Sequence, residues 1–324
     1  MLKFLRSHYW NIGLCVILAM LFVFTKIIQP NYGASGLEAL ARAALPFAFA
    51  TAAQAIVVIA GGIDLSIASM MAVASVTAAV LMDGASEQAA LWVVPFVLLV
   101  GVCMGAINGM LIVFTRVPDI VVTLAMLFVW EGVALMILKA PGGGAADWLM
   151  GLLVGSVSIY GVPESITQFV PKSFILLVVC IGVVWWPFRR SRFGLSVYAI
   201  GSSSLAAFRS GVSVNRTKIA AYAMAGLFAA MGGLVLTAST GIGAPIPGPY
   251  LLASVAAVVL GGVTLGGGRG GLIGPIIAVI ILRLVRTDLA LLSVDPNVTA
   301  IVEGTIMVVV VMAGGLIAVR SRHK

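Results

Sequence analysis

The stretch AIVVIAGGIDLSIASMMAVASV, residues 55–76, is apolar almost throughout, yet it carries a carboxylate, Asp64, just after two glycines. An aspartate at the centre of a helix in hydrocarbon costs about 2.5–3.5 kcal/mol on insertion scales, so Asp64 must face protein, water or a membrane surface. Glycines weaken a helix, and a membrane tolerates the freed backbone groups only inside the protein. We therefore predict that one helix ends near Gly61 and that a second helix starts after Asp64.

Two roles are open for Asp64. The first is structural, because a carboxylate just before LSIAS can cap the next helix and oppose its positive end. The second is functional, with Asp64 binding a cation or a transported solute. The sequence favours the structural role and leaves the functional one open.

The composition excludes an ordinary soluble domain. Of the 324 residues, 61% are hydrophobic and 9% are charged, and the mean hydropathy is +1.17. Soluble domains carry about 25% charged residues, whereas lipid can solvate a large apolar surface. The net charge of +8 is typical of Lys and Arg gathered in cytoplasmic loops. We therefore predict an all-α polytopic membrane protein, with residues 1–324 forming one domain.

Apolar runs near the length of a membrane-spanning helix, about 20 residues, number about ten. They cover residues 10–29, 43–61, 65–82, 91–114, 119–138, 173–188, 218–238, 251–266, 271–287 and 299–319. An even number of spans places both termini on one side. The basic connections on that side are Arg116, residues 188–194, residues 208–218 and the C-terminal tail. The positive-inside rule then predicts that both termini are cytoplasmic.

Two stretches of the chain are similar to each other in sequence. AQAIVVIAGGIDLS, residues 53–66, resembles ASVAAVVLGGVTLG, residues 253–266. Chance is one explanation, because Ala, Val and Gly are abundant here. The other is two related, glycine-broken halves, roughly residues 43–138 and 218–319, an arrangement that marks the transport pathway in many carriers. The candidate pathway residues are Gly61, Gly62, Asp64, Ser66, Gly261, Gly262 and Thr264.

Several catalytic and nucleotide-binding classes are excluded by motif. No GxxxxGK[ST] sequence occurs, so the chain has no P-loop. GGGRGG, residues 266–271, contains a GxGxxG pattern but follows a membrane span rather than a strand, which predicts a cytoplasmic turn with Arg269 facing headgroups or a partner. Both histidines lie in the terminal tails, which leaves no metal or triad constellation. We expect no enzymatic activity and no cofactor in this chain.

Four stretches in order along the chain carry a family resemblance. They are GGIDLSIAS (61–69), AINGMLIVFTRVPDIVVTLAML (106–127), the segment 192–235 and AAVVLGGVTLGGGRGGLIGPIIA (256–278). Together they resemble the multi-pass inner-membrane permease subunit of bacterial ABC importers of the ribose, xylose and arabinose type. The likeness has departures: Glu131 stands where the family commonly has Arg, and Ser202–Ser204 replaces its Gly-Gly-Asn.

The resemblance implies that several proteins share the steps of import. A periplasmic binding protein captures a monosaccharide or polyol, two permeases, identical or paired, form the pathway, and separate cytoplasmic ATPases bind ATP and Mg²⁺. It also implies a short coupling helix within residues 202–214, where a Ser-rich start favours helix capping. The candidate coupling residues are Ser203, Leu205, Ala206, Ala207, Phe208, Arg209 and Gly211.

The rival interpretation is an ion-coupled carrier that works alone on a small neutral solute. Such a carrier needs titratable groups near the middle of the membrane, and Asp64 and Glu131 are the candidates. Within the resembling family, the solute stays open among pentoses, hexoses, sugar alcohols, inositol, nucleosides and sugar-like signal molecules.

Overall fold

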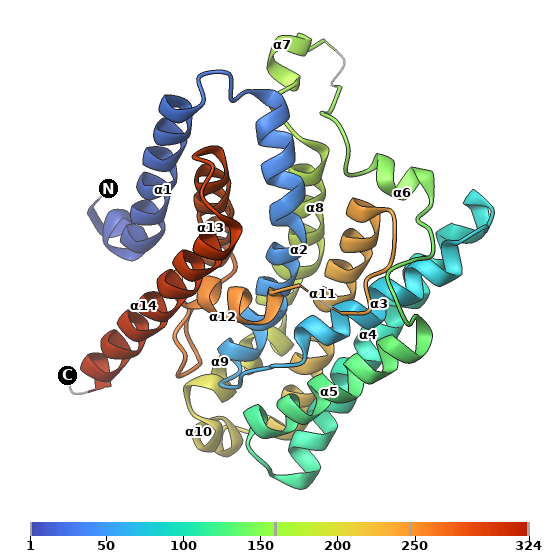
Figure 1. The fold of residues 1–324 in the computed structure, drawn as a ribbon. Helices are drawn as coiled ribbons and strands as arrows, with labels where there is room; N and C mark the ends of the chain where they lie inside the picture. Colours follow the sequence, from blue (N-terminus) through green and yellow to red (C-terminus); the bar gives the residue numbers. More distant parts are fainter. Residues whose placement is uncertain (1, 159–160, 247, 323–324) are drawn as a thin grey trace.

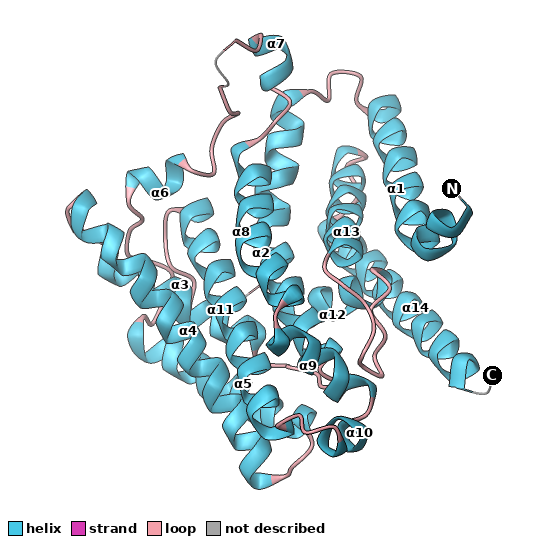
Figure 2. Ribbon diagram, turned by 180° about the vertical axis from the view of Figure 1, so that it is seen from behind, coloured by secondary structure: helices cyan, strands magenta, loops and turns pink. Residues whose placement is uncertain are grey.

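The computed structural model describes residues 2–158, 161–246 and 248–322, and within these ranges the chain is entirely helical apart from two isolated bridges. Its helices are α1 (Leu2–Ile28), α2 (Ala34–Ile59), α3 (Ile67–Met82), α4 (Glu87–Thr115), α5 (Asp119–Ile137), α6 (Asp147–Gly151), α7 (Glu164–Thr167), α8 (Lys172–Arg190), α9 (Arg192–Ser202), α10 (Ser204–Arg209), α11 (Val214–Thr240), α12 (Tyr250–Leu260), α13 (Ile273–Leu291) and α14 (Pro296–Arg322). Figure 2 shows helices and loops only in this part of the chain. The predicted all-α class is confirmed.

Each predicted span meets one helix, but the lengths differ. Over the described residues, six helices are long and apolar enough to cross a membrane: Trp10–Ile28 of α1 together with α2, α4, α5, α8 and α11. α12 covers 11 residues and stops at Leu260, so the predicted span 251–266 is too long. Its two glycines, Gly261 and Gly262, end the helix early. α2 begins nine residues before the predicted span, because Glu38 and Arg42 do not interrupt it.

The bundle has two distinct ends (Figure 1). α6 and α7 lie at one end, and α9 and α10 lie at the other. α4 and α5 flank α11 on one side, whereas α1, α13 and α14 lie on the opposite side. α2 is almost wholly buried between them, since every side chain from Ala44 to Ile59 is buried. α9 was not predicted as a separate helix.

The closest packing in the bundle joins α4 to α11. Gly101, Gly105 and Gly109 recur every four residues along α4, which presents a strip without side chains to Tyr222 and Gly226 of α11. A Cβ atom on Gly105 would overlap the carbonyl oxygen of Tyr222. Small residues at this spacing let two helix backbones touch inside a membrane. The sequence interpretation missed this contact, although the glycine spacing indicates it.

We expect Gly105→Ala to lower the free energy of unfolding by about 1–3 kcal/mol, because the added methyl overpacks a backbone contact. Gly182→Ala in α8 is the matched control, since a Cβ at Gly182 meets no atom within 4 Å. That control should be neutral, or more stable by up to about 1 kcal/mol from helix propensity. Equilibrium unfolding of the purified protein in mixed detergent micelles measures both. Equal effects of the two substitutions would contradict the direct α4–α11 contact.

Candidate functional site

The break predicted after Gly61 is present and has a defined geometry. α2 ends at Ile59, and Gly61 adopts a φ of +87°. The N–H of Gly62 donates to the carbonyl of Val57 at 2.9 Å, and the N–H of Gly61 donates to that of Val58 at 3.0 Å. This pair of bonds is a Schellman ending, which needs a glycine at the left-handed position.

α12 ends in the same way. The N–H of Val263 donates to Val258 at 3.1 Å, the N–H of Gly262 donates to Val259 at 3.0 Å, and Gly262 has a φ of +82°. Gly262 is therefore the structural counterpart of Gly61. The sequence similarity of the two stretches instead pairs Gly61 with Gly261, one residue earlier. The two similar stretches end their helices in the same way, while duplication of whole halves stays a prediction.

Asp64 begins a buried chain of hydrogen bonds across the break. Its Oδ1 accepts from the N–H of Ser66 at 2.8 Å and from the Ser66 hydroxyl at 2.6 Å. Asn108 of α4 donates to the Ser66 Oγ at 2.7 Å. Trp130 of α5 donates from Nε1 to Asn108 Oδ1 at 3.1 Å. The broken segment is thus tied to α4 and α5.

This network corrects the predicted capping geometry. Ser66, not Asp64, is the residue at the N-cap of α3, and its side chain makes no capping bond. Asp64 instead binds the N–H of Ser66, and both residues are fully buried. Within the described residues, Asp64 Oδ2 has no hydrogen-bond partner. The contacts favour the structural role, and a role in the pathway stays a prediction.

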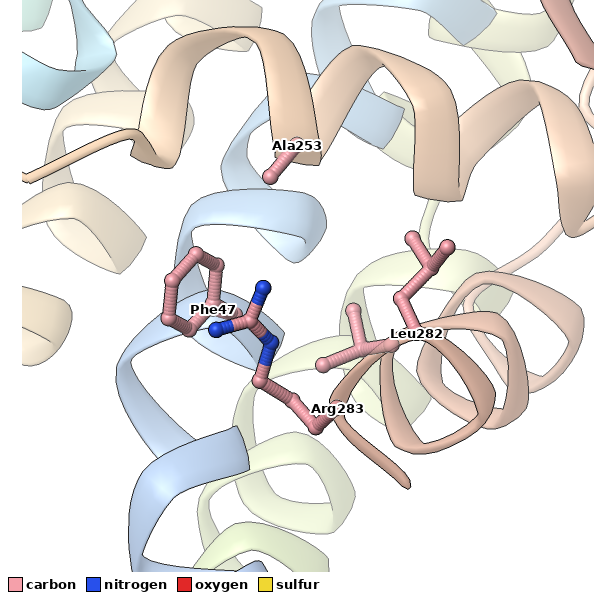
Figure 3. A pocket seen from close by; sticks show the side chains of 5 residues that line it. Phe47, Ala253, Leu282 and Arg283 are labelled. Atoms are coloured by element: carbon pink, nitrogen blue, oxygen red, sulfur yellow. The ribbon is translucent and has the colours of Figure 1, made fainter. Parts of the chain in front are cut away.

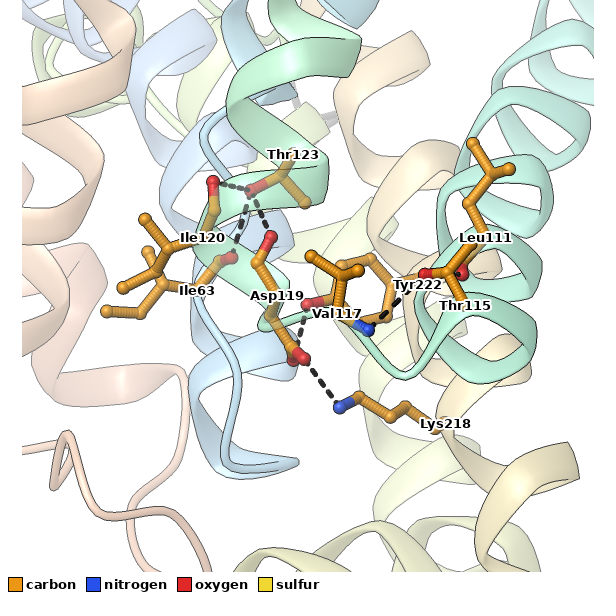
Figure 4. Close-up of polar contacts among 9 residues, drawn as sticks. All are labelled: Ile63, Leu111, Thr115, Val117, Asp119, Ile120, Thr123, Lys218 and Tyr222. Atoms are coloured by element: carbon orange, nitrogen blue, oxygen red, sulfur yellow. Dashed lines mark hydrogen bonds and ion pairs between the residues drawn. The ribbon is translucent and has the colours of Figure 1, made fainter.

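A second polar cluster lies next to the break (Figure 4), and the sequence interpretation missed it. Asp119, the first residue of α5, accepts from Lys218 Nζ at 2.6 Å and from the Tyr222 hydroxyl at 2.9 Å. Thr123 donates to the carbonyl of Ile63 at 3.3 Å, inside the break itself. The sequence did contain a signal for this cluster: Asp119 stands at the start of one apolar run, and Lys218 stands at the start of another.

Two segments, α9 and the GGGRGG turn, converge on the end of α2. The N–H of Gly268, in the GGGRGG turn, donates to the carbonyl of Ile59 at 2.9 Å. A side chain at Gly201, near the end of α9, would collide with the same carbonyl. The Tyr198 hydroxyl of α9 donates to the carbonyl of Gly270 at 2.9 Å. We call these contacts the α2–α9–turn junction; Arg269 lies exposed beside it.

α10 matches the predicted short helix and carries the predicted coupling residues. Ser203 caps it, because its Oγ accepts from the N–H of Ala206 at 3.2 Å. Ala207 is buried, whereas Leu205 and Phe208 are 60% and 68% exposed. The exposed Arg209 ends the helix, and Gly211 follows with a φ of +84°. α10 therefore presents an apolar face with a basic end.

The predicted pathway residues make local contacts around the ends of α2 and α12. Gly262 lies against Trp10 of α1, whose Nε1 donates to the carbonyl of Leu260 at 2.9 Å. Gly261 packs on Pro275, and Thr264 donates to the carbonyl of Gly267 at 3.1 Å within the turn. The residues form two helix ends, which the turn connects.

Two further charged features lie within the predicted spans: a cluster around Glu303 and the carboxylate of Glu131. Glu303 accepts from Arg283 at 3.3 Å and from Arg286 at 3.2 Å, which explains why two arginines are tolerated in the ninth span. Glu131 of α5 is half-buried and has no hydrogen bond or ion pair among the described residues. No group of three or more His, Cys, Asp or Glu side chains there is placed to hold a metal ion.

Comparison with known proteins identifies one family and a set of relatives. The family model described as branched-chain amino acid transport system / permease component matches residues 36–311. The chain is 28% identical to the autoinducer 2 import system permease protein LsrD of Escherichia coli K12, over 99% of this chain and 96% of that protein. The same figures hold for LsrD of Shigella flexneri and of Escherichia coli O157:H7. No solved structure matches.

We expect Ser66→Ala to lower the free energy of unfolding by about 1–2 kcal/mol, because it leaves Asp64 and Asn108 short of a partner. Ser69→Ala is the matched control. Ser69 is equally buried but donates only to the carbonyl of Ser66 in its own turn, so its loss should cost at most about 0.5 kcal/mol. Unfolding in mixed micelles compares the two, and a larger loss in Ser69→Ala would refute the network's importance.

Proposed function

This chain belongs to the family of branched-chain amino acid transport system permease components, and we propose that it is the subunit through which a bacterial ABC importer moves a monosaccharide or similar small polyol. A member of this family is a multi-pass membrane permease. It has no ATPase activity or cofactor of its own, because a partner ATPase handles ATP. The family resemblance read from the sequence is confirmed.

The observation that carries the proposal is the exposed apolar face of α10. Exposed Leu205 and Phe208 are costly in water, and a helix of six residues has little stability of its own. A groove on a cytoplasmic ATPase would cover both side chains and pair with Arg209. The helix directly follows α9, whose C-terminal end next to α10 enters the α2–α9–turn junction, so force on α10 has a short route to the broken helices.

The opposite end of the bundle supports docking of a binding protein. Glu38 of α2 accepts from the N–H of Gly155 at 2.7 Å, and Glu87 of α4 accepts from the N–H of Asp147 at 3.3 Å. These bonds anchor the connection around α6 and α7 on the bundle. Leu152 and Ile166 of that connection are 45% and 59% exposed, which suits a partner surface.

The exposed face of α5 supports pairing with a second permease. α5 packs on α3 and α4, while Val121, Phe128 and Met136 are exposed. Glu131 is half-buried in the same helix, and no described residue bonds to it. A lone carboxylate is unfavourable against lipid. A second copy or a paralogue facing α5 across an aqueous passage would give Glu131 water and cover the apolar side chains.

The solute class rests on resemblance and on charge. The description of the family names branched-chain amino acids, and the relatives are named for autoinducer 2 import. A zwitterion needs partners for both its charges, whereas several charged groups within the bundle already have partners in the chain: Asp119 pairs with Lys218, Arg283 pairs with Glu303, and Asp64 and Asp288 accept from Ser66 and Thr25. A neutral polyol makes no such demand. The same pairing disfavours the ion-coupled carrier, for which the two candidates named from the sequence remain: Glu131 and the Oδ2 atom of Asp64, to which no described residue bonds.

The test is reconstitution with the ATPase, the partner permease if one is encoded, and the binding protein from the same gene cluster. ATP hydrolysis and uptake are measured in liposomes with D-ribose, D-xylose, L-arabinose, myo-inositol, autoinducer 2 and L-leucine. We expect ATP-dependent uptake of one of the polyols or autoinducer 2. Uptake of L-leucine alone would overturn the solute class. Accumulation driven by a proton gradient without ATP would overturn the importer.

We expect Arg209→Glu to reduce uptake at least tenfold, because the reversed charge opposes docking of α10 on the ATPase. Binding-protein docking should stay unchanged, since α10 lies at the opposite end from α6 and α7. Arg192→Glu, at the start of α9, is the charge-matched control and should keep most activity. Unchanged uptake in Arg209→Glu, measured in the same liposomes, would remove α10 from the coupling route.

A further inference from the structure

A seam inside the chain joins the two predicted halves near the middle of the bundle. There α2 packs against both α12 and α13. A pocket in this seam is lined by Phe47, Ala253, Val279, Leu282 and Arg283 (Figure 3). Phe47 and Arg283 each lie near the middle of their helices. This level, between repeated halves, is where many membrane carriers hold their solutes.

Arg283 brings donors into the seam. Its guanidinium carbon lies 3.9 Å from the centroid of the Phe47 ring, and Nη2 donates to Glu303. A guanidinium has five N–H donors, and the described residues supply this single acceptor. The ring of Tyr250 lies 4.4 Å from that of Phe47, centroid to centroid. The pocket thus combines aromatic faces with a cation whose charge Glu303 offsets.

α2 adds two polar side chains to the same face. Phe47 contacts Tyr250 of α12 and Arg283 of α13. Helical spacing places Thr51 and Gln54 on the same face of α2 as Phe47, whereas Phe49 on the opposite face stacks on Phe228 of α11. Thr51 and Gln54 are fully buried. Within the described residues, the Thr51 hydroxyl and both polar atoms of the Gln54 amide lack a hydrogen-bond partner.

Unpartnered buried amides and hydroxyls are unfavourable, so this conformation leaves the seam unsatisfied. The pocket leaves no room for a water molecule between its lining side chains. A hydroxyl both donates and accepts, which suits an amide, a hydroxyl and a guanidinium spread along one face. A sugar also has an apolar face that suits an aromatic ring.

We propose that the seam of α2, α12 and α13 is a subsite for a neutral polyol, closed in this conformation and opened when α12 and α13 move away from α2. Gln54 and Thr51 then exchange hydrogen bonds with solute hydroxyls, and Arg283 donates to a third. This subsite rests on the proposed function and is a solute contact within one permease chain, separate from the passage that we propose along α5. The turn that follows α12 also bonds the end of α2, which links opening to the α2–α9–turn junction.

The test uses Gln54→Met and Thr51→Val, which remove polar atoms at nearly constant volume. The melting temperature of the purified full-length chain is followed in detergent with millimolar D-ribose, D-xylose, L-arabinose or myo-inositol. We expect at least one sugar to give a saturable upward shift, as a ligand of the folded state must. Gln54→Met should need roughly tenfold more sugar for the same shift, from the loss of one or two hydrogen bonds.

Thr237→Val is the matched control. Thr237 is as buried as Thr51, but it bonds to Ser75 between α3 and α11, away from the seam. Its loss should lower the melting temperature while the sugar dependence stays that of the wild type. Polyols also stabilise proteins without binding, but that effect does not saturate and is equal in all variants.

Two results overturn the subsite: no saturable shift with any of the four sugars, or an equal shift in wild type and Gln54→Met. Sugar uptake by the complete importer, measured separately, tests the proposed function. A sugar that is imported at the same rate by Gln54→Met leaves that function intact and removes the subsite. A sugar that shifts the melting temperature but is not imported leaves the subsite intact and contradicts the proposed function for that sugar.

Discussion

One constraint organises this molecule: in an apolar solvent, the backbone groups freed by a broken helix must find partners within the protein. α2 breaks at Gly61, and each freed group draws in another segment. The carbonyl of Ile59 takes the N–H of Gly268, and that of Ile63 takes the hydroxyl of Thr123. The turn after α12 and the start of α5 are therefore placed around α2 by the needs of its interrupted backbone.

The helices were predictable from the sequence because the length of an apolar run is a local property. The break was predictable too, since a Gly-Gly pair before a carboxylate has few other uses in hydrocarbon. α9 was not, because its residues contain no apolar run of spanning length. The α2 boundary was misjudged for a related reason: the predicted span began at residue 43, but the helix reaches back to Ala34, and Glu38 within that extension is held by the N–H of Gly155, 117 positions away.

The candidate site was predictable only where it depends on local chemistry. Ser203 caps α10, and the apolar residues of the helix follow shortly after it, so the local sequence is enough to predict this helix. The clusters around Asp119 and Glu303 depend on partners brought together by the fold, as does the burial of Gln54. Pairing these residues requires knowing that α5 meets α11 and that α13 meets α14, which single-sequence patterns do not contain.

The broken helices also explain how a passive gate can respond to a partner. A continuous α2 would resist bending, but here its end is joined to α9 and to the turn by single bonds and glycine contacts. Rotation of α9 must either carry the Ile59 carbonyl with it or release the N–H of Gly268. If that bond is released, the turn can carry α12 and α13 relative to α2. Packed elements joined this way shift between discrete arrangements rather than deforming smoothly, as the proposed alternating access of this subunit requires.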